Sequence, residues 1–219
     1  MQWLNRLTDL VIINLFVFLF FLPAGCLFLV LAGLLPVTAL SVGISLLTPL
    51  LGSALTAMHY CILKMVRGED AYPLRSFFHS YKENLRQATL LFLLFLVLYG
   101  ILLADLTILQ SARGAWVRPM YLLSFGGLIV LTMVFLYAFP LQARFDNPLR
   151  ATLKNAFLIA VIAFPKTLAM LLIVVALFLL CVTAGLRIVP FLLLFGFTVP
   201  AYLRALLYSP VFKRFEEET

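Results

Sequence analysis

Long apolar runs alternate with short polar segments along the whole of the 219-residue chain. Residues 10–63 contain no Lys, Arg, Asp or Glu, and further apolar runs follow near 88–109 and 120–141. A membrane crossing needs about 20 apolar residues, because the hydrocarbon layer is ~30 Å thick and a helix rises ~1.5 Å per residue. We therefore predict an all-α, polytopic transmembrane helical bundle of about six spans, with five as the alternative.

The boundaries of these spans follow from the residues that break helices. The first long run exceeds one crossing, and Gly33 and Pro36 mark a turn within it. Gly185 and Pro190 mark the turn between the last two spans, and the start of the fifth span is indistinct. The predicted spans are 11–34, 44–65, 88–109, 120–141, 167–181 and 188–208. The remaining segments are too short for a soluble domain, so residues 1–219 are predicted to form a single membrane domain.

Two of the polar segments have helical periodicity of their own. In residues 73–87 and 148–160, apolar side chains recur at helical intervals opposite a basic face. Pro73 and Pro148 suit the first turn of such helices. We predict two cytoplasmic, interfacial, amphipathic helices. Residues expected to contact lipid headgroups are Arg75, Lys82 and Arg86, and residues expected to form a structural cap before the second helix are Arg144, Asp146 and Asn147.

Composition narrows the class of protein further. The chain is 64% apolar and 11% charged, with a mean hydropathy of +1.13, whereas soluble domains are about 45–50% apolar and about 25% charged. This excludes a soluble globular enzyme and a disordered chain. The net charge of +7 comes from Lys and Arg in short loops between apolar runs. Such loops set membrane topology and attract anionic lipids, so we expect no nucleic-acid partner.

The distribution of Lys and Arg predicts the orientation, because cytoplasmic loops carry an excess of them. One side of the membrane would carry Arg6, Lys64, Arg67, Arg75, Lys82, Arg86, Arg144, Arg150, Lys154, Arg204, Lys213 and Arg214. The other side would carry Arg113, Arg118 and Arg187. Both termini are therefore predicted to be cytoplasmic.

The sequence contains no motif for catalysis or cofactor binding. It lacks a nucleophile elbow, a phosphate-binding loop and a zinc-binding His-Glu-x-x-His pattern. His59 and His79 are far apart, and Cys26, Cys61 and Cys181 lie in apolar stretches without metal-ligand spacing. We predict that the chain is not an enzyme, binds no metal or cofactor, and does not itself hydrolyse ATP.

A few polar residues within the spans are candidates for a solute pathway. Thr48, Gly52 and Thr56 recur every four residues, a spacing that favours close helix packing. The alternative is a pathway lined by Thr48, Thr56 and His59. Asp105 lies near the outer end of the third span, where a carboxylate is either hydrated or part of a pathway.

Several stretches carry a family resemblance. Residues 49–60, 64–67, 76–88, 144–147 and 153–156 occur in this order, and with them the whole chain resembles the YesL family of bacterial integral membrane proteins. The resemblance implies a multi-pass protein of the bacterial plasma membrane, from a family often encoded beside carbohydrate ABC importers. It implies no catalytic residues, because the family has no established biochemical activity.

Three functions are compatible with these features. The first is an accessory or permease-like subunit that supports carbohydrate uptake with an ABC importer permease, ATPase or solute-binding protein. In that case Arg150, Lys154 and Asn155 are expected to face the partner. The second is a stand-alone small-solute transporter or channel, for which a homo-oligomer is an expected form. The third is a non-transporting membrane protein that recruits lipid or another protein.

Overall fold

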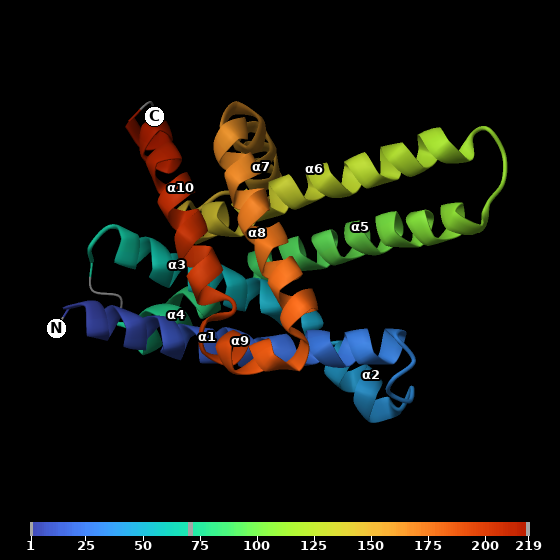
Figure 1. Ribbon diagram of the computed structural model, residues 1–219. Coiled ribbons are helices and arrows are strands. Elements are labelled where there is room, and N and C mark those ends of the chain that lie inside the picture. Colours follow the sequence, from blue (N-terminus) through green and yellow to red (C-terminus); the bar gives the residue numbers. More distant parts are fainter. Residues whose placement is uncertain (1, 70–71, 218–219) are drawn as a thin grey trace.

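The part that the computed structural model describes, residues 2–69 and 72–217, consists of helices joined by short turns and loops (Figure 1). This confirms the all-α architecture expected from the apolar runs. The α-helices are α1 (Gln2–Leu31), α2 (Ala39–Ser45), α3 (Leu51–Val66), α4 (Pro73–Glu83), α5 (Leu85–Ser111), α6 (Val117–Arg144), α7 (Leu149–Ile162), α8 (Phe164–Ala184), α9 (Val189–Phe195) and α10 (Thr198–Glu217). Two 3₁₀ turns, Thr48–Leu50 and Gly185–Ile188, precede α3 and α9.

Five helical segments are long and apolar enough to cross a membrane. They are Arg6–Leu31, Ala39–Val66, Leu85–Ser111, Val117–Arg144 and Phe164–Ala184. A sixth candidate is bent by 50° at a short break between Val189–Phe195 and Thr198–Lys213. Counting the bent pair as one span gives six spans, and omitting it gives five, which are the two numbers that the sequence predicts.

The helices α5 and α6 form a long antiparallel hairpin that extends away from the other elements, while α9 lies along α1 (Figure 1). The buried core lies at the opposite end of this hairpin, where α3 is surrounded by α1, α5, α6 and α10. Most residues of α3 are buried, so this helix is the centre of the bundle. The exposed apolar side chains of α5, α6 and α8 are the surface that lipid covers.

The short helix α4 packs against α1 through aromatic rings. The ring of Tyr81 lies 4.8 Å from that of Phe20, and the ring of Phe77 lies 5.3 Å from that of Phe16. Because burial disfavours the phenolate, the pKa of Tyr81 lies above its ordinary value. These rings hold the apolar face of α4 against the bundle, so its basic face is free to contact the membrane surface.

The helix predicted over residues 73–87 ends at Glu83. Asn84 interrupts it with backbone dihedrals of φ −94° and ψ 3°, outside the α-helical region. Its backbone N–H and its side-chain amide both donate to the carbonyl oxygen of Ser80, at 3.0 Å and 3.1 Å. The following residues belong to α5, which begins at Leu85. Arg86 is therefore part of a membrane-spanning helix rather than of the interfacial one.

The structural cap predicted before residues 148–160 is not formed as expected. The helix α7 begins at Leu149 with Pro148 at the N-cap position, and no side chain caps it. A proline side chain has no hydrogen-bonding atom to offer the first turn. Asp146 and Asn147 thus lie before the N-cap position rather than at it. Arg144 is the last residue of α6.

The helices α3 and α5 approach closely at Gly52. A Cβ atom added there would overlap the carbonyl oxygen of Ala88 and lie 2.5 Å from the Cβ atom of Phe92. The neighbouring Ser53 donates to the carbonyl oxygen of Leu85 at 3.1 Å. Small residues in α3 thus serve helix packing, as their four-residue spacing favours.

We expect Gly52→Ala to lower the free energy of unfolding by about 1–3 kcal/mol, because the added methyl group forces α3 and α5 apart. Gly100→Ala is the matched control, because a Cβ atom at Gly100 of α5 would meet no atom within 4 Å. Thermal unfolding of both purified variants in detergent measures the difference. Equal stability of the two variants would contradict the close approach.

Candidate functional site

The break between α9 and α10 is held by a single side chain from the first span. Asn14 of α1 is fully buried. Its amide nitrogen donates to the carbonyl oxygens of Leu192 at 3.0 Å and Leu193 at 2.8 Å. Its amide oxygen accepts from the backbone N–H groups of Phe197 at 2.8 Å and Thr198 at 3.1 Å. Asn14 therefore provides a partner for the Leu193 carbonyl and for the two N–H groups at the bend, which lipid could not provide. The Leu192 carbonyl also accepts from the Gly196 N–H at 3.0 Å.

A cavity of about 480 Å³ lies beside this break. Helices α1, α3, α5, α6, α8 and α10 line it, mostly with apolar side chains. Three polar side chains reach its wall: Tyr99, Thr132 and Arg204. The hydroxyl of Tyr99 donates to that of Thr132 at 3.0 Å, and Nε of Arg204 donates to the carbonyl oxygen of Pro200 at 3.2 Å. A discontinuous span beside a cavity is a recurrent arrangement in transporters.

Arg204 is the charged residue that lines this cavity in the described part of the chain. One turn further along α10, the hydroxyl of Tyr208 lies 3.0 Å from Nδ1 of His59 on α3. Both rings are almost completely buried. This hydrogen bond joins the second span to the sixth, and it gives His59 a partner within the protein.

The residues that the sequence proposes for a solute pathway lie in separate places. Thr56 donates to the carbonyl oxygen of Gly52 in its own helix at 3.0 Å, while Thr48 has a buried hydroxyl with no hydrogen-bond partner in the described chain. Asp105 accepts a hydrogen bond from Ser124 across the α5–α6 hairpin. None of Thr48, Thr56, His59 or Asp105 lines the cavity beside Arg204.

A second polar cluster joins the ends of several helices. The side-chain amide of Gln142 in α6 donates to the amide oxygens of Gln87 at 2.6 Å and Asn84 at 3.3 Å. Its own oxygen accepts from the hydroxyl of Thr152 in α7 at 3.1 Å. The ring of Phe145, just after α6, lies 5.9 Å from that of Phe212 in α10. These contacts gather the α4–α5 junction, α7 and the final turns of α10 at one side of the bundle.

The helix α7 presents a basic face away from this cluster. Arg150 and Lys154 are exposed and lie one turn apart, whereas Thr152 faces the bundle and is fully buried. Asn155 is half-buried and lines a cavity of about 350 Å³ together with Phe145 and Phe212. The structure therefore places two of the three predicted docking residues on the outer face and turns Asn155 toward α10.

The basic residues expected at lipid headgroups are all exposed. Arg75 and Lys82 lie two turns apart on α4, and Arg86 lies in the first turn of α5. No cluster of three or more His, Cys, Asp or Glu side chains forms among the residues that the structure describes.

Sequence reasoning missed the three residues that organise the interior: Asn14, Gln142 and Arg204. Arg204 is assigned from the sequence to a cytoplasmic cluster of positive charges, although it lies inside the predicted span 188–208. A charge within a span is itself a signal of function or of burial against protein. Asn14 is likewise a polar residue within an otherwise apolar run, which indicates function or burial against protein.

Residues 10–106 match the family described as "Protein of unknown function, DUF624". The matched segment runs from within α1 to within α5, and the helices of the chain are those of a multi-pass membrane protein. The curated protein "Uncharacterized protein YteU" of Bacillus subtilis (strain 168) is 29% identical over 128 residues. That segment spans 58% of this chain and 57% of YteU. No solved structure matches the chain.

We expect Asn14→Leu to destabilise the protein by about 3–6 kcal/mol, because several buried backbone groups lose their partner at about 1–3 kcal/mol each. Thr183→Val is the matched control, because the Thr183 hydroxyl bonds only to carbonyl oxygens of its own helix, at 2.8 Å for Leu179. Thermal unfolding in detergent compares the two. A loss no greater for Asn14→Leu than for Thr183→Val would show that Asn14 does not hold the break.

Proposed function

We propose that this protein is a non-enzymatic, accessory or permease-like subunit of the bacterial plasma membrane that supports carbohydrate uptake with an ABC importer. The supporting observation is the outer face of α7. This 14-residue helix connects two spans, is anchored to the bundle by the Thr152–Gln142 hydrogen bond, and exposes Arg150 and Lys154. A short helix between spans is the element through which importer permeases contact their ATPase.

The orientation is part of the proposal. We infer that α4, α7 and both termini are cytoplasmic, because these segments carry most of the Lys and Arg residues outside the spans. The gathering of the α4–α5 junction, α7 and α10 at one side of the bundle supports a common side for them. The resemblance to the YesL family supports the carbohydrate importer as the partner.

The partner would supply the energy for transport. The chain has no phosphate-binding loop for ATP, so the importer ATPase would hydrolyse the nucleotide and this chain would contribute a membrane surface. The two exposed cations of α7 would then face carboxylates on that partner, because complementary charge sets the specificity of such an interface.

The double variant Arg150→Glu/Lys154→Glu is expected to lower recovery of importer subunits by about tenfold or more, because like charges at an interface oppose association. The tagged protein is purified from membranes of its native host in mild detergent, and mass spectrometry quantifies the copurified permease, ATPase and solute-binding protein. Arg113→Glu/Arg118→Glu is the matched control, because these exposed residues lie at the far end of the α5–α6 hairpin. Unchanged recovery with the α7 variant would refute docking through this face.

The cavity beside the broken span favours a second candidate function, a stand-alone transporter of a small solute. The supporting observation is Arg204, a cation on the wall of an apolar cavity of about 480 Å³. In this case the purified protein in proteoliposomes would take up labelled mono- or oligosaccharides without a partner. Arg204→Gln would reduce that uptake about tenfold or more, the effect of losing a charged hydrogen-bond donor.

Two results separate these candidates. Uptake by proteoliposomes that contain this protein alone supports the transporter, and absence of uptake together with copurified importer subunits supports the accessory role. Asp105→Asn provides a further comparison within the transporter assay, because Asp105 bonds to Ser124 and does not line the cavity. Uptake that is insensitive to Arg204→Gln would remove the cavity from the transport pathway.

A further inference from the structure

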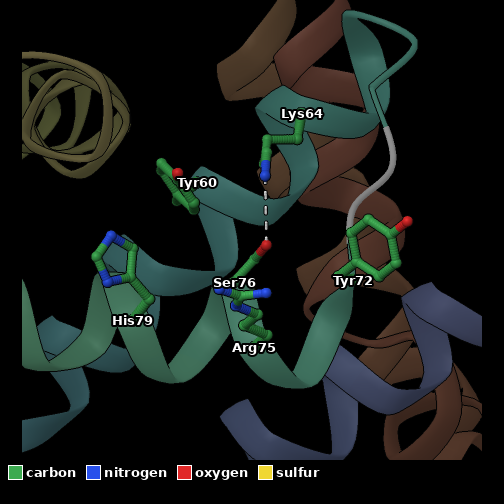
Figure 2. A pocket seen from close by; sticks show the side chains of 6 residues that line it. All are labelled: Tyr60, Lys64, Tyr72, Arg75, Ser76 and His79. Carbon is green, nitrogen blue, oxygen red and sulfur yellow. Dashed lines mark hydrogen bonds between the residues drawn. The ribbon is translucent and has the colours of Figure 1, made fainter.

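A second, polar pocket of about 300 Å³ lies between α3 and α4 (Figure 2). Its walls come from one face of each helix. The residues of each face recur three or four positions apart, so they lie side by side on the helix surface. The face of α3 consists of Tyr60 and Lys64, and the face of α4 and its N-cap consists of Tyr72, Arg75, Ser76 and His79. Neither face belongs to the cavity beside Arg204 or to the outer face of α7.

The pocket is positively charged and rich in hydrogen-bond donors. The ammonium group of Lys64 lies 3.4 Å from the hydroxyl of Ser76 and 5.6 Å from the centre of the Tyr60 ring. Figure 2 shows Lys64 reaching from α3 toward Ser76, with Arg75 beside it on α4. Arg75 makes no hydrogen bond or ion pair with any residue that the structure describes. Its five N–H donors are available to a ligand.

Two acidic residues on the adjoining segments, Glu69 and Glu83, have partners of their own. A carboxylate oxygen of Glu69 lies 2.8 Å from Nε of Arg67. A carboxylate oxygen of Glu83 lies 3.5 Å from Nε2 of His79, one turn further along α4. Among residues 2–69 and 72–217, the six that line the pocket include no acidic side chain. A bound anion would therefore meet basic side chains and hydroxyl groups on this part of the wall.

The pocket lies at the level of the membrane surface. The second span ends at Val66 and the third begins at Leu85, and α4 connects them. The buried ring of Phe77 fixes α4 against α1. Tyr72 has left-handed backbone dihedrals, φ 39° and ψ 66°, immediately before Pro73, a conformation that costs a non-glycine residue energy. This backbone conformation holds the phenol of Tyr72 at the rim of the pocket (Figure 2).

We propose that this pocket binds the phosphate group of an anionic phospholipid headgroup. Lys64 supplies a point charge and Arg75 supplies a planar fork, the two side chains through which proteins hold phosphate oxygens. The hydroxyls of Tyr60, Tyr72 and Ser76 supply neutral donors. This inference is independent of the importer role. It differs from general attraction to an anionic surface, because Lys82 and Arg86 lie outside the pocket.

The test uses the full-length protein in mild detergent, to which phosphatidylglycerol is added. Native mass spectrometry measures the bound lipid, and diacylglycerol with the same acyl chains is the ligand control without phosphate. Arg75→Gln is expected to weaken phosphatidylglycerol binding about tenfold, the effect of losing one charged hydrogen-bonding partner. Arg75→Gln removes no hydrogen bond or ion pair between residues that the structure describes, so we expect the variant to keep its fold. Lys64→Gln is expected to have a similar effect.

Lys82→Gln is the matched control variant, because Lys82 is exposed on the same helix, two turns from Arg75 and outside the pocket. Its phosphatidylglycerol binding is expected to stay within about twofold of the unchanged protein, because it removes only a surface charge. Competition by inorganic phosphate identifies the source. Phosphate that binds alone, and is lost in Arg75→Gln, supports the same phosphate site with a soluble ligand. Equal losses for Arg75→Gln and Lys82→Gln, or equal binding of diacylglycerol, would overturn the proposal.

Discussion

The arrangement of this protein depends on one constraint: a backbone that bends inside hydrocarbon must find hydrogen-bonding partners in protein, because lipid tails offer none. The break between α9 and α10 exposes carbonyl and N–H groups at the place where the sixth span changes direction. Asn14 supplies both a donor and an acceptor to them from the first span. The first and last spans are thereby tied together, although Asn14 and Leu192 are 178 residues apart in sequence.

The hydrogen bonds of Asn14 also fix the position of α10 relative to the other helices. With α9 and α10 held against α1, α10 turns back across α3, where Tyr208 bonds to His59. Arg204 reaches the wall of the cavity beside the bend. At the same side as the α4–α5 junction, Gln142 joins three helices through side-chain hydrogen bonds alone. The interior thus contains a polar centre near the bend, while the helix ends contain a polar cluster that positions α7.

Much of the fold could be predicted from the sequence, because the thickness of the hydrocarbon layer sets the length of an apolar run directly. The runs and the residues that break them indicate the five long apolar segments. The helical periodicity around Phe77 and Ala156 indicates α4 and α7, whereas α2 and α9 lie within the predicted turns and spans. The end of α4 could not be predicted in this way. It depends on the local backbone conformation of Asn84 and on its second hydrogen bond to the Ser80 carbonyl, and periodicity carries no information about either.

The candidate sites were harder to predict, because they depend on which helices touch. The role of Asn14 follows from its hydrogen bonds to the bend between α9 and α10. The role of Arg204 follows from its place on the wall of a cavity that six helices line. Lys64 and Arg75 are visible in the sequence as two basic residues among many, and the packing of α4 on α3 makes them one pocket. In each case the missing information is a contact distant in sequence.

The central claim is that α9 and α10 form one bent span whose break is bonded to Asn14. Amide hydrogen exchange of the full-length protein in lipid nanodiscs, measured for the segment around Phe197 and Thr198, tests this most directly. Our account predicts that these amides exchange as slowly as those of the flanking helices, and that they become fast when Asn14 is replaced by Leu. Fast exchange of this segment in the unchanged protein would contradict it.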